Sequence, residues 1–458
     1  MNQKFLIFVL IIILISGCAS FKPEEKNFDV KMPESFTKNL SGNVKIEKWW
    51  EDLNNEELNY LVETALKNNN TIKKAFETLK KSGAVSAKEK SGLFPDLDIE
   101  GGISETRTDK NTSKSSSARL AASYEIDLWG KINSRVKAAE FNEKAARSEL
   151  ESAAVTIASE TVTTWKDITS INSRLKILNE ILNQNENQLE ILKLRYKNGM
   201  TKASNIYDHK KETISLKETI NSIELEKTLL LNKLIYLTGI DSLKLKVSEL
   251  PDLPPMPETG IPLDILSSRP DIKASFSRLN ASQQNLYSAK KNMLPKLSIS
   301  GAIGLGSDDF SLSIDDWISN LAANLAAPVF NGGNLKEEIK RTRAERNENL
   351  YSYKDLVISA LKEVSDAVSE EKSQLKKLEL VKKRIEASKT SLYYSENEYK
   401  NGSSDYIDYI EKYNYLKNLE SILINEKSNL LEYRISLYRA IGSTWAEKFA
   451  KNMENKNE

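Results

Sequence analysis

Residues 129–132 read WGKI and residues 196–199 read YKNG, and the stretch between these two marks decides the fold. It contains no proline and no internal glycine, and its apolar residues recur at steps of three, four and seven. A repeat that averages 3.5 residues keeps one narrow seam facing a neighbouring helix, so the stretch predicts a coiled-coil helix. At 1.5 Å per residue, roughly 67 residues would form a rod about 100 Å long.

The same stretch occurs a second time. The second copy begins at Gly332 and ends with YKNG at residues 399–402, about 203 positions after the first. Apolar residues fill matching slots in the two copies: Leu175, Leu178, Leu182, Leu189 and Leu192, then Leu378, Val381, Ile385 and Leu392. Because glycine allows the left-handed turn that ends a helix, each copy predicts a rod, a tight turn and a return helix of about 38 residues.

A lead-in helix is expected before each rod. The first is predicted as one helix from Leu58 to the stop at Pro95, with Trp49 and Trp50 packed against its start. The second begins in the motif SRPDI at residues 268–272 and stops about 200 positions after the first. Lead-in and return helices are short enough to stack end to end beside one rod.

Two alternating apolar and polar runs lie between each lead-in helix and its rod. They cover residues 97–106 and 119–128, with a loop near 108–117, and then 297–305 and 321–329. Each run is about ten residues long, which fits a tilted strand that crosses an outer membrane with its apolar side toward lipid. The alternative is a soluble hairpin with one buried face.

Four strands per chain cannot close a sheet in lipid, where the smallest barrels have about eight. Two chains would supply eight strands with a nearly filled interior, and three would supply twelve with room for a pore. The predicted fold is therefore mixed α/β but mainly α. It combines a long coiled-coil helical barrel with a transmembrane β-barrel of four strands per chain, twelve in a trimer.

The amino terminus predicts export and lipid attachment. Lys4 precedes an apolar run at residues 5–15, too short to span a bilayer but suited to a signal peptide. The run ends at the single cysteine, Cys18, in a sequence that resembles the bacterial lipobox. That resemblance implies cleavage before Cys18 and attachment of a diacylglycerol and an acyl chain such as palmitate. An ordinary signal peptide with an incidental cysteine, or a short anchor, is the alternative.

These signals divide the chain into six predicted segments. They are a signal peptide (1–17), a tether (18–48), a first repeat (49–240), a proline-rich link (241–267), a second repeat (268–442) and a polar tail (443–458) that is expected to fray from Lys448.

Composition excludes several classes of function. The 66 basic and 65 acidic residues nearly cancel, so no preference for nucleic acid is indicated. One histidine and one cysteine are too few for a catalytic triad, a histidine-rich metal site or a cysteine zinc site. His209 lies among charged residues and is interpreted as a plain surface histidine. We expect no cofactor, no metal and no enzymatic activity.

The ordered motifs resemble the TolC family of outer-membrane efflux proteins, nearest the lipoprotein branch that includes OprM and CusC. The resemblance rests on Cys18, the KWW motif at residues 48–50, the SRPDI motif, PVFNGG at residues 328–333 and both Tyr-x-x-Gly turns. It implies a homotrimer with a periplasmic helical tunnel. It also implies that the helix tips dock onto a membrane-fusion adaptor and, through it, onto an inner-membrane pump of the RND or ABC type.

The resemblance also suggests residues at the tunnel entrance. Asp408 and Glu411 follow the second turn at the spacing of the family's gate carboxylates, and three residues apart they share one helical face. Asp208 matches Glu411 in the first repeat. Three chains would gather six like charges at the constriction; a solvated acidic face is the alternative.

The tips themselves provide the candidate adaptor-docking residues. These are Tyr196, Gly199, Tyr399 and Gly402. Tyrosines that simply pack in the seam are the alternative.

Three functions remain open from the sequence. The first is the passive exit duct of a tripartite efflux system. The second is the outer-membrane duct of a type I protein secretion system. The third is a coiled-coil surface lipoprotein without a pore.

Overall fold

The computed structural model describes residues 47–241, 245, 249–257, 268–307, 315, 317–442 and 444–455. The predicted signal peptide, Cys18 and most of the tether therefore lie outside the described residues, as do parts of the proline-rich link and of the tail. The chain forms two compact units. One contains the four strands, the helix α7 (Pro270–Lys291) for most of its length and the first turns of both rods; the other contains the helical hairpins.

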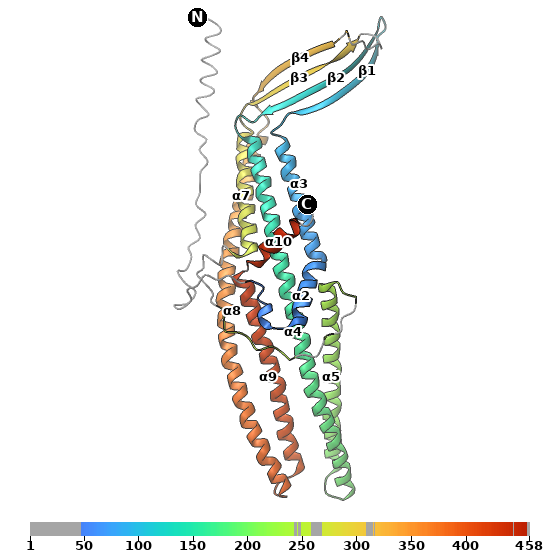
Figure 1. The fold of residues 1–458 in the computed structure, drawn as a ribbon, viewed down its shortest axis with the longest axis vertical. Helices are drawn as coiled ribbons and strands as arrows, with labels where there is room; N and C mark the ends of the chain where they lie inside the picture. The colour runs from blue at the N-terminus through green and yellow to red at the C-terminus, as the bar shows by residue number, and fades with distance from the viewer. Residues whose placement is uncertain are drawn as a thin grey trace. The chain divides into compact units, whose positions relative to one another are not determined.

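The strands form one antiparallel sheet. They are β1 (Asp96–Arg107), β2 (Thr112–Ile126), β3 (Lys296–Ser307) and β4 (Trp317–Ala326), and they lie side by side in chain order (Figure 1). The central ladder pairs β2 with β3 and so joins the two repeats. The outer strands β1 and β4 each pair on one side within the chain.

The register of the first three strands places apolar residues opposite apolar residues. Ile99 lies opposite Leu120, which lies opposite Ile303, so large apolar side chains line up on one face. On the other face Arg119 donates to Glu100 from Nε at 2.6 Å. Both faces of the pattern agree with the sequence prediction of an apolar and a polar side.

Gly304 lies opposite Arg119 on β2, with no room for a side chain. A Cβ atom at this position would lie 2.3 Å from the Ala118 carbonyl oxygen and 2.5 Å from the Arg119 Cα. Those atoms belong to the paired backbone and cannot turn aside as a side-chain tip can. This position therefore requires glycine.

The predicted strand boundaries were partly wrong. The loop expected near residues 108–117 is shorter, because β2 already begins at Thr112, and β2 ends at Ile126. Likewise β4 covers residues 317–326 rather than 321–329, and Val329 lies beyond its end. Backbone pairing continues past the apolar alternation, as the Arg107–Thr112 pair shows.

Two long hairpins form the core of the helical unit. The helix α4 (Lys131–Lys197) is followed by α5 (Ala203–Thr238), and α8 (Asn334–Lys400) by α9 (Tyr406–Ile441) (Figure 1). Each rod has 67 residues and each return helix 36. The prediction of two equal hairpins is confirmed, and with it the fold class of four strands and two repeats in a mainly helical chain.

The first lead-in helix is interrupted, which the sequence prediction missed. It consists of α2 (Glu56–Asn68) and α3 (Asn70–Ser91), separated at Asn69, whose backbone is extended. The Asn69 side chain accepts from Thr71 N at 2.8 Å and so caps α3. The predicted apolar face of α2 is fully buried, at Leu58, Leu61, Val62, Ala65 and Leu66.

The tryptophans pack at the start of the lead-in segment, as expected. The short 3-10 helix η1 (Glu51–Leu53) follows Trp49 and Trp50, which are both buried. Trp49 stacks on Tyr438 at 5.0 Å between ring centroids, and Trp50 meets Trp445 edge to face at 4.9 Å. These rings join the start of the repeats to the end of the chain.

The tail prediction was wrong. Residues Trp445–Asn455 form the helix α10, whose Trp445, Ala446 and Ala450 are buried. Arg147 of α4 donates to both carboxylate oxygens of Glu454, at 2.8 and 3.2 Å. The tail is therefore part of the core. Within the described residues, no helix is long and apolar enough to cross a membrane.

Candidate functional site at the helical turns

The two hairpin turns have the same geometry. Gly199 and Gly402 adopt positive φ angles of 72° and 73°. In the first turn Gly199 N donates to Tyr196 O at 2.9 Å and Met200 N to Arg195 O at 2.8 Å. The second turn repeats both bonds from Gly402 and the residue after it, at 3.0 and 2.9 Å. This pair of bonds is the Schellman motif, which satisfies the last carbonyls of a helix.

The two turns differ in their aromatic neighbours. Tyr399 lies 5.2 Å from Tyr406 and 6.3 Å from Tyr409, measured between ring centroids, so the second turn carries a cluster of three tyrosines. Tyr399 remains 41% exposed and Tyr196 of the first turn 50% exposed. Both candidate docking tyrosines are thus accessible in the single chain.

The seam inside each hairpin is apolar. In the first hairpin Ile171, Leu175 and Leu178 of α4 are buried against Ile220 and Ile223 of α5. The second hairpin buries four residues in the same way: Val381, Ile385, Leu416 and Leu419. Because apolar burial stabilises each seam without directional bonds, each hairpin holds together as a unit.

The two hairpins share an apolar core, in which Trp165 of α4 is buried in the same cluster as Val364 of α8 and Leu431 of α9. Polar bonds between α4 and α9 add to this contact: Glu180 accepts from Lys417 at 2.8 Å, and Lys166 donates to Glu432 at 2.8 Å. Nearer the turns, Gln184 donates to the Tyr406 hydroxyl at 3.1 Å. Burial works to lower the pKa of Lys417, but its hydrogen bonds to Glu180 and Glu420 outweigh that effect and raise it.

An ion pair closes this polar contact beside the turns. Arg195, in the last turn of α4, forms a two-pronged bond to Asp405, which directly precedes α9; its second prong measures 3.2 Å. The hydrogen bond from Arg195 lowers the pKa of Asp405. Sequence reasoning missed both residues, because a charge near a helix end usually belongs to a solvated face.

The predicted gate carboxylates lie on the exposed side of α9. Asp408 accepts from the Ser404 hydroxyl at 2.9 Å. Glu411, one turn further on, lines a shallow groove with Ser388, Ser391 and Tyr415. Within one chain the two carboxylates are exposed neighbours on one helix.

His209 was interpreted wrongly as a surface residue. It is only 7% exposed, and its Nε2 lies 2.8 Å from the Asn185 carbonyl oxygen of α4. The charged residues beside it in sequence misled the prediction, because helical spacing turns His209 and Thr213 toward α4 while its neighbours face outward. Among the described residues no group of three or more metal-binding side chains occurs.

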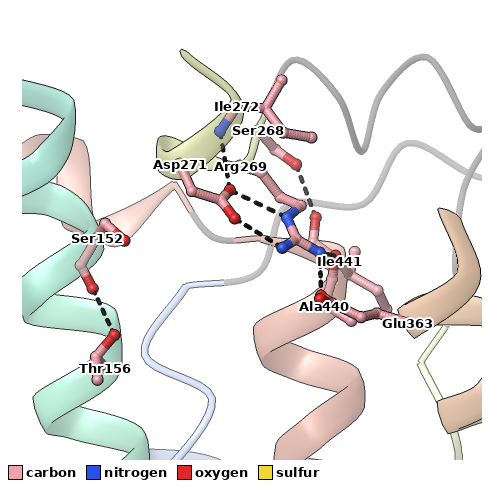
Figure 2. A network of polar contacts seen from close by, with 9 residues as sticks. All are labelled: Ser152, Thr156, Ser268, Arg269, Asp271, Ile272, Glu363, Ala440 and Ile441. Carbon is pink, nitrogen blue, oxygen red and sulfur yellow. Dashed lines mark hydrogen bonds and ion pairs between the residues drawn. The ribbon is translucent and has the colours of Figure 1, made fainter. Parts of the chain in front are cut away.

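The SRPDI motif connects three helices of the second repeat (Figure 2). Arg269 donates to Asp271, to Glu363 of α8 at 2.7 Å and to the Ala440 carbonyl of α9 at 3.3 Å. Ser268 donates to the Ile441 carbonyl at 2.7 Å. The motif therefore both starts α7 and caps the end of α9, which explains its residue types.

A second buried arginine reinforces the same helix. Arg434 of α9 donates to both carboxylate oxygens of Glu371, and neither side chain is more than 3% exposed. Its remaining nitrogen donates to the Pro254 carbonyl at 2.9 Å. The pair thereby fixes the proline-rich link against α8 and α9.

The chain therefore has two coiled-coil hairpins in tandem, each preceded by two strands of one antiparallel sheet. The chain belongs to the outer membrane efflux protein family, whose model matches residues 61–213 and 261–443. It is 24% identical to the pyoverdine export outer membrane protein OpmQ of Pseudomonas aeruginosa, over 97% of this chain and 98% of the relative. The protein is thus an outer-membrane efflux component, in a family of channels.

Solved structures agree on the fold. The CmeC outer membrane channel of Campylobacter jejuni superposes with a TM-score of 0.83 at 23% identity, covering 94% of this chain and 98% of CmeC. The outer-membrane channel OprN superposes with a TM-score of 0.84 at 20% identity, covering 93% and 98%.

Proposed function

We propose that this chain is the exit duct of a tripartite efflux system and conducts substrates passively to the exterior. The observation that carries the proposal is the four-stranded sheet, which is apolar on one face and has β1 and β4 at its edges. In lipid, edges with unpaired backbone groups must be closed. Three copies would close a barrel of twelve strands, wide enough for a pore.

The homotrimer has further support from the helices. Large apolar side chains of α5 point away from its own hairpin and are exposed in the single chain: Tyr207, Ile214, Leu225, Leu229 and Tyr236. A row of this kind at helical spacing fits a neighbouring copy in a helical tube. The six segments predicted from the sequence, with the repeats at 49–240 and 268–442, remain our proposed division of the chain.

The amino-terminal segment would fix the trimer to the membrane. We propose acylation at Cys18 after removal of residues 1–17, which anchors the tether in the outer membrane with several acyl chains. Replacement of Cys18 by Ser should abolish metabolic labelling with palmitate, while trimers still reach the outer membrane through their strands.

The turns are the proposed periplasmic entrance. Tyr196, Gly199, Tyr399 and Gly402 would contact the adaptor, and the adaptor would connect the duct to an inner-membrane pump of the RND or ABC type. Asp408 and Glu411 would form a ring of six carboxylates when three chains meet, which favours cations.

Planar-bilayer recording tests the duct. Purified trimers should conduct, and the variant with Asp408→Asn and Glu411→Gln should conduct with weaker cation preference. A trimer that never conducts, including after both carboxylates are changed, would support the pore-less surface lipoprotein instead. Restored drug efflux with an RND pump, against restored protein secretion with an ABC transporter, separates the two kinds of duct.

A further inference from the structure

A groove lies between α2 and α10 in the helical unit. It is lined by Tyr60 and Leu66 of α2 and by Phe449 and Met453 of α10, and we call it the α2–α10 groove. Its volume is about 1220 Å³, whereas sites for small molecules typically measure about 300–1,000 Å³. The groove is therefore large enough for a segment of polypeptide chain.

The apolar surface of the groove is only partly covered. Leu66 is buried and Phe449 is half-buried against the apolar core, but Tyr60 is 63% exposed. Charged side chains surround this apolar surface: Glu51, Asp52, Glu63, Lys67 and Lys448. An apolar surface with a charged rim is typical of a docking site.

The first described residues connect the two sides of the groove. Glu47 accepts from Lys448 of α10 at 2.8 Å, and the next residue, Lys48, donates to Glu63 of α2. Both Glu47 and Lys48 line the groove, and Trp49 after them is buried. The predicted tether therefore joins the helical unit at this groove.

The sequence that precedes Glu47 has the composition that the groove requires. Residues 36–46 read FTKNLSGNVKI, in which Phe36, Leu40, Val44 and Ile46 are apolar. The two charged residues of this segment are both lysines, and it contains no acidic residue. Acidic side chains outnumber basic ones among the lining residues, so the segment and the groove carry opposite net charge.

We propose that residues 36–46 dock in the α2–α10 groove of their own chain, so that α10 clamps the end of the tether. The apolar residues of the segment would cover the exposed surface of Tyr60, because burial of apolar area favours association. Lipid attached at Cys18, as proposed above, would then be linked to the helical unit at this groove. The docking needs no pore, so it stands or falls apart from the proposed duct.

Covalent attachment favours this occupant over a free partner. The segment is joined to the groove at Glu47, and a short connection raises the effective concentration of a tethered group to the millimolar range. A free peptide must compete with that concentration. The tether of a neighbouring copy is the other occupant that the test has to separate.

Cysteine pairs test the docking in the full chain. Leu40→Cys or Val44→Cys, each combined with Met453→Cys, should give a disulfide within one chain in at least one of the two pairs under mild oxidation. Lys451→Cys is the matched control, because residue 451 lies on the same helix but does not line the groove. A disulfide requires Cβ atoms about 3.5–4.5 Å apart, so this control should stay reduced.

Peptide mapping and non-reducing gels separate the outcomes. A bond between the tether and residue 453 within one chain supports the proposal. A bond between two chains would assign the groove to the neighbour's tether and overturn it. Absence of any bond from both pairs, or equal bonding to residue 451, would overturn it as well.

Hydrogen exchange tests the docking in the wild-type protein. Amides of residues 38–46 should exchange at least about tenfold more slowly than amides of residues 20–30, after correction for intrinsic rates. Equal exchange of the two segments would refute the docking.

A matched pair of tyrosine variants shows whether the groove provides this protection. Tyr60→Lys places a cation on the exposed side of α2, where it removes apolar area and repels the lysines of the segment, so most of the protection should disappear. Tyr351→Lys changes a tyrosine of α8 that is 68% exposed and does not line the groove, and it should keep the wild-type protection. The same protection in both variants would contradict the proposal.

Discussion

The two return helices have the same length but different surroundings. Both α5 and α9 contain 36 residues, yet only seven residues of α5 are buried, compared with thirteen residues of α9. The end of α5 receives a hydrogen bond from the side-chain amide of Asn69, which donates to the Leu237 carbonyl at 2.9 Å. The end of α9 meets Ser268 and the buried guanidinium of Arg269, while Arg434 ties its last turns to Glu371.

This difference shows that the two repeats hold equivalent helices by different kinds of contact. Buried charge pairs hold helices in one geometry, because any displacement leaves a charge without its partner. A single amide bond adds only about 1 kcal/mol and tolerates rearrangement. Within one chain, buried charge pairs therefore hold α9, whereas α5 exposes an apolar row that a neighbouring copy would cover in the proposed trimer.

The largest effect is expected from breaking the buried pair on α9. Arg434→Ala leaves Glu371, which is fully buried, without its partner and should destabilise the protein by about 3–5 kcal/mol. Thermal unfolding of the detergent-solubilised protein, followed by circular dichroism, measures the loss. The double change Arg434→Met with Glu371→Leu should recover most of the stability. A mild effect of the single change would show that α9 is not fixed by charge.

The next largest effects are expected at the ends of α9 and α5, where the losses of stability should differ. Arg269→Ala removes donors to Asp271, Glu363 and a helix carbonyl, and should cost about 3 kcal/mol. Asn69→Ala removes one cap and one carbonyl partner and should cost about 1–2 kcal/mol. The same unfolding assay compares them. Equal losses would contradict the unequal anchoring of α5 and α9.

The turns should respond equally, in contrast to the helix ends. Gly199→Ala and Gly402→Ala each place a side chain in the left-handed region at a cost of about 1–2 kcal/mol. A Cβ at either position meets nothing within 4 Å, so the strain is conformational alone. Matched midpoints of thermal unfolding for the two variants would confirm this. Different midpoints would mean that a turn has contacts beyond its own backbone.

The smallest effect is expected at the ion pair between the hairpins. Arg195 and Asp405 are partly exposed, so Asp405→Asn should cost about 0.2–1 kcal/mol. Because the pKa of Asp405 is lowered in the folded protein, the contribution is present above its usual value and is lost only below about pH 4. The free energy of unfolding, measured from about pH 3 to about pH 8, should fall below about pH 4 in the wild type. This fall should be smaller in the Asp405→Asn variant.

The hairpins could be predicted because their signals are local. The Schellman turns follow from Gly199 and Gly402, and the seam follows from leucine spacing, so both could be predicted without knowing which distant segments pack against them. The sheet was predictable for the same reason, since alternation marks the face of a strand. The ends of the strands were not predictable, because the extra pairing at the start of β2, from Thr112 onward, depends on the partner strand β1.

The charged contacts could not be predicted, because their partners lie far apart in sequence. Arg434 meets Glu371 and Arg195 meets Asp405 only after the hairpins form. His209 was hidden among charged neighbours, although its four-residue spacing to Thr213 was visible. The helix α10 was missed because its polar residues outnumber Trp445, Ala446 and Ala450, which bury its inner face.

The ladder between β2 and β3 also constrains the order of assembly. Ile126 pairs with Leu297, so the first hairpin and the proline-rich link must be synthesised before the central ladder can begin to form. Until then β1 and β2 remain a lone two-stranded ribbon, which is marginally stable in water. A chain whose second half is still missing therefore presents unpaired strand edges, which favour aggregation.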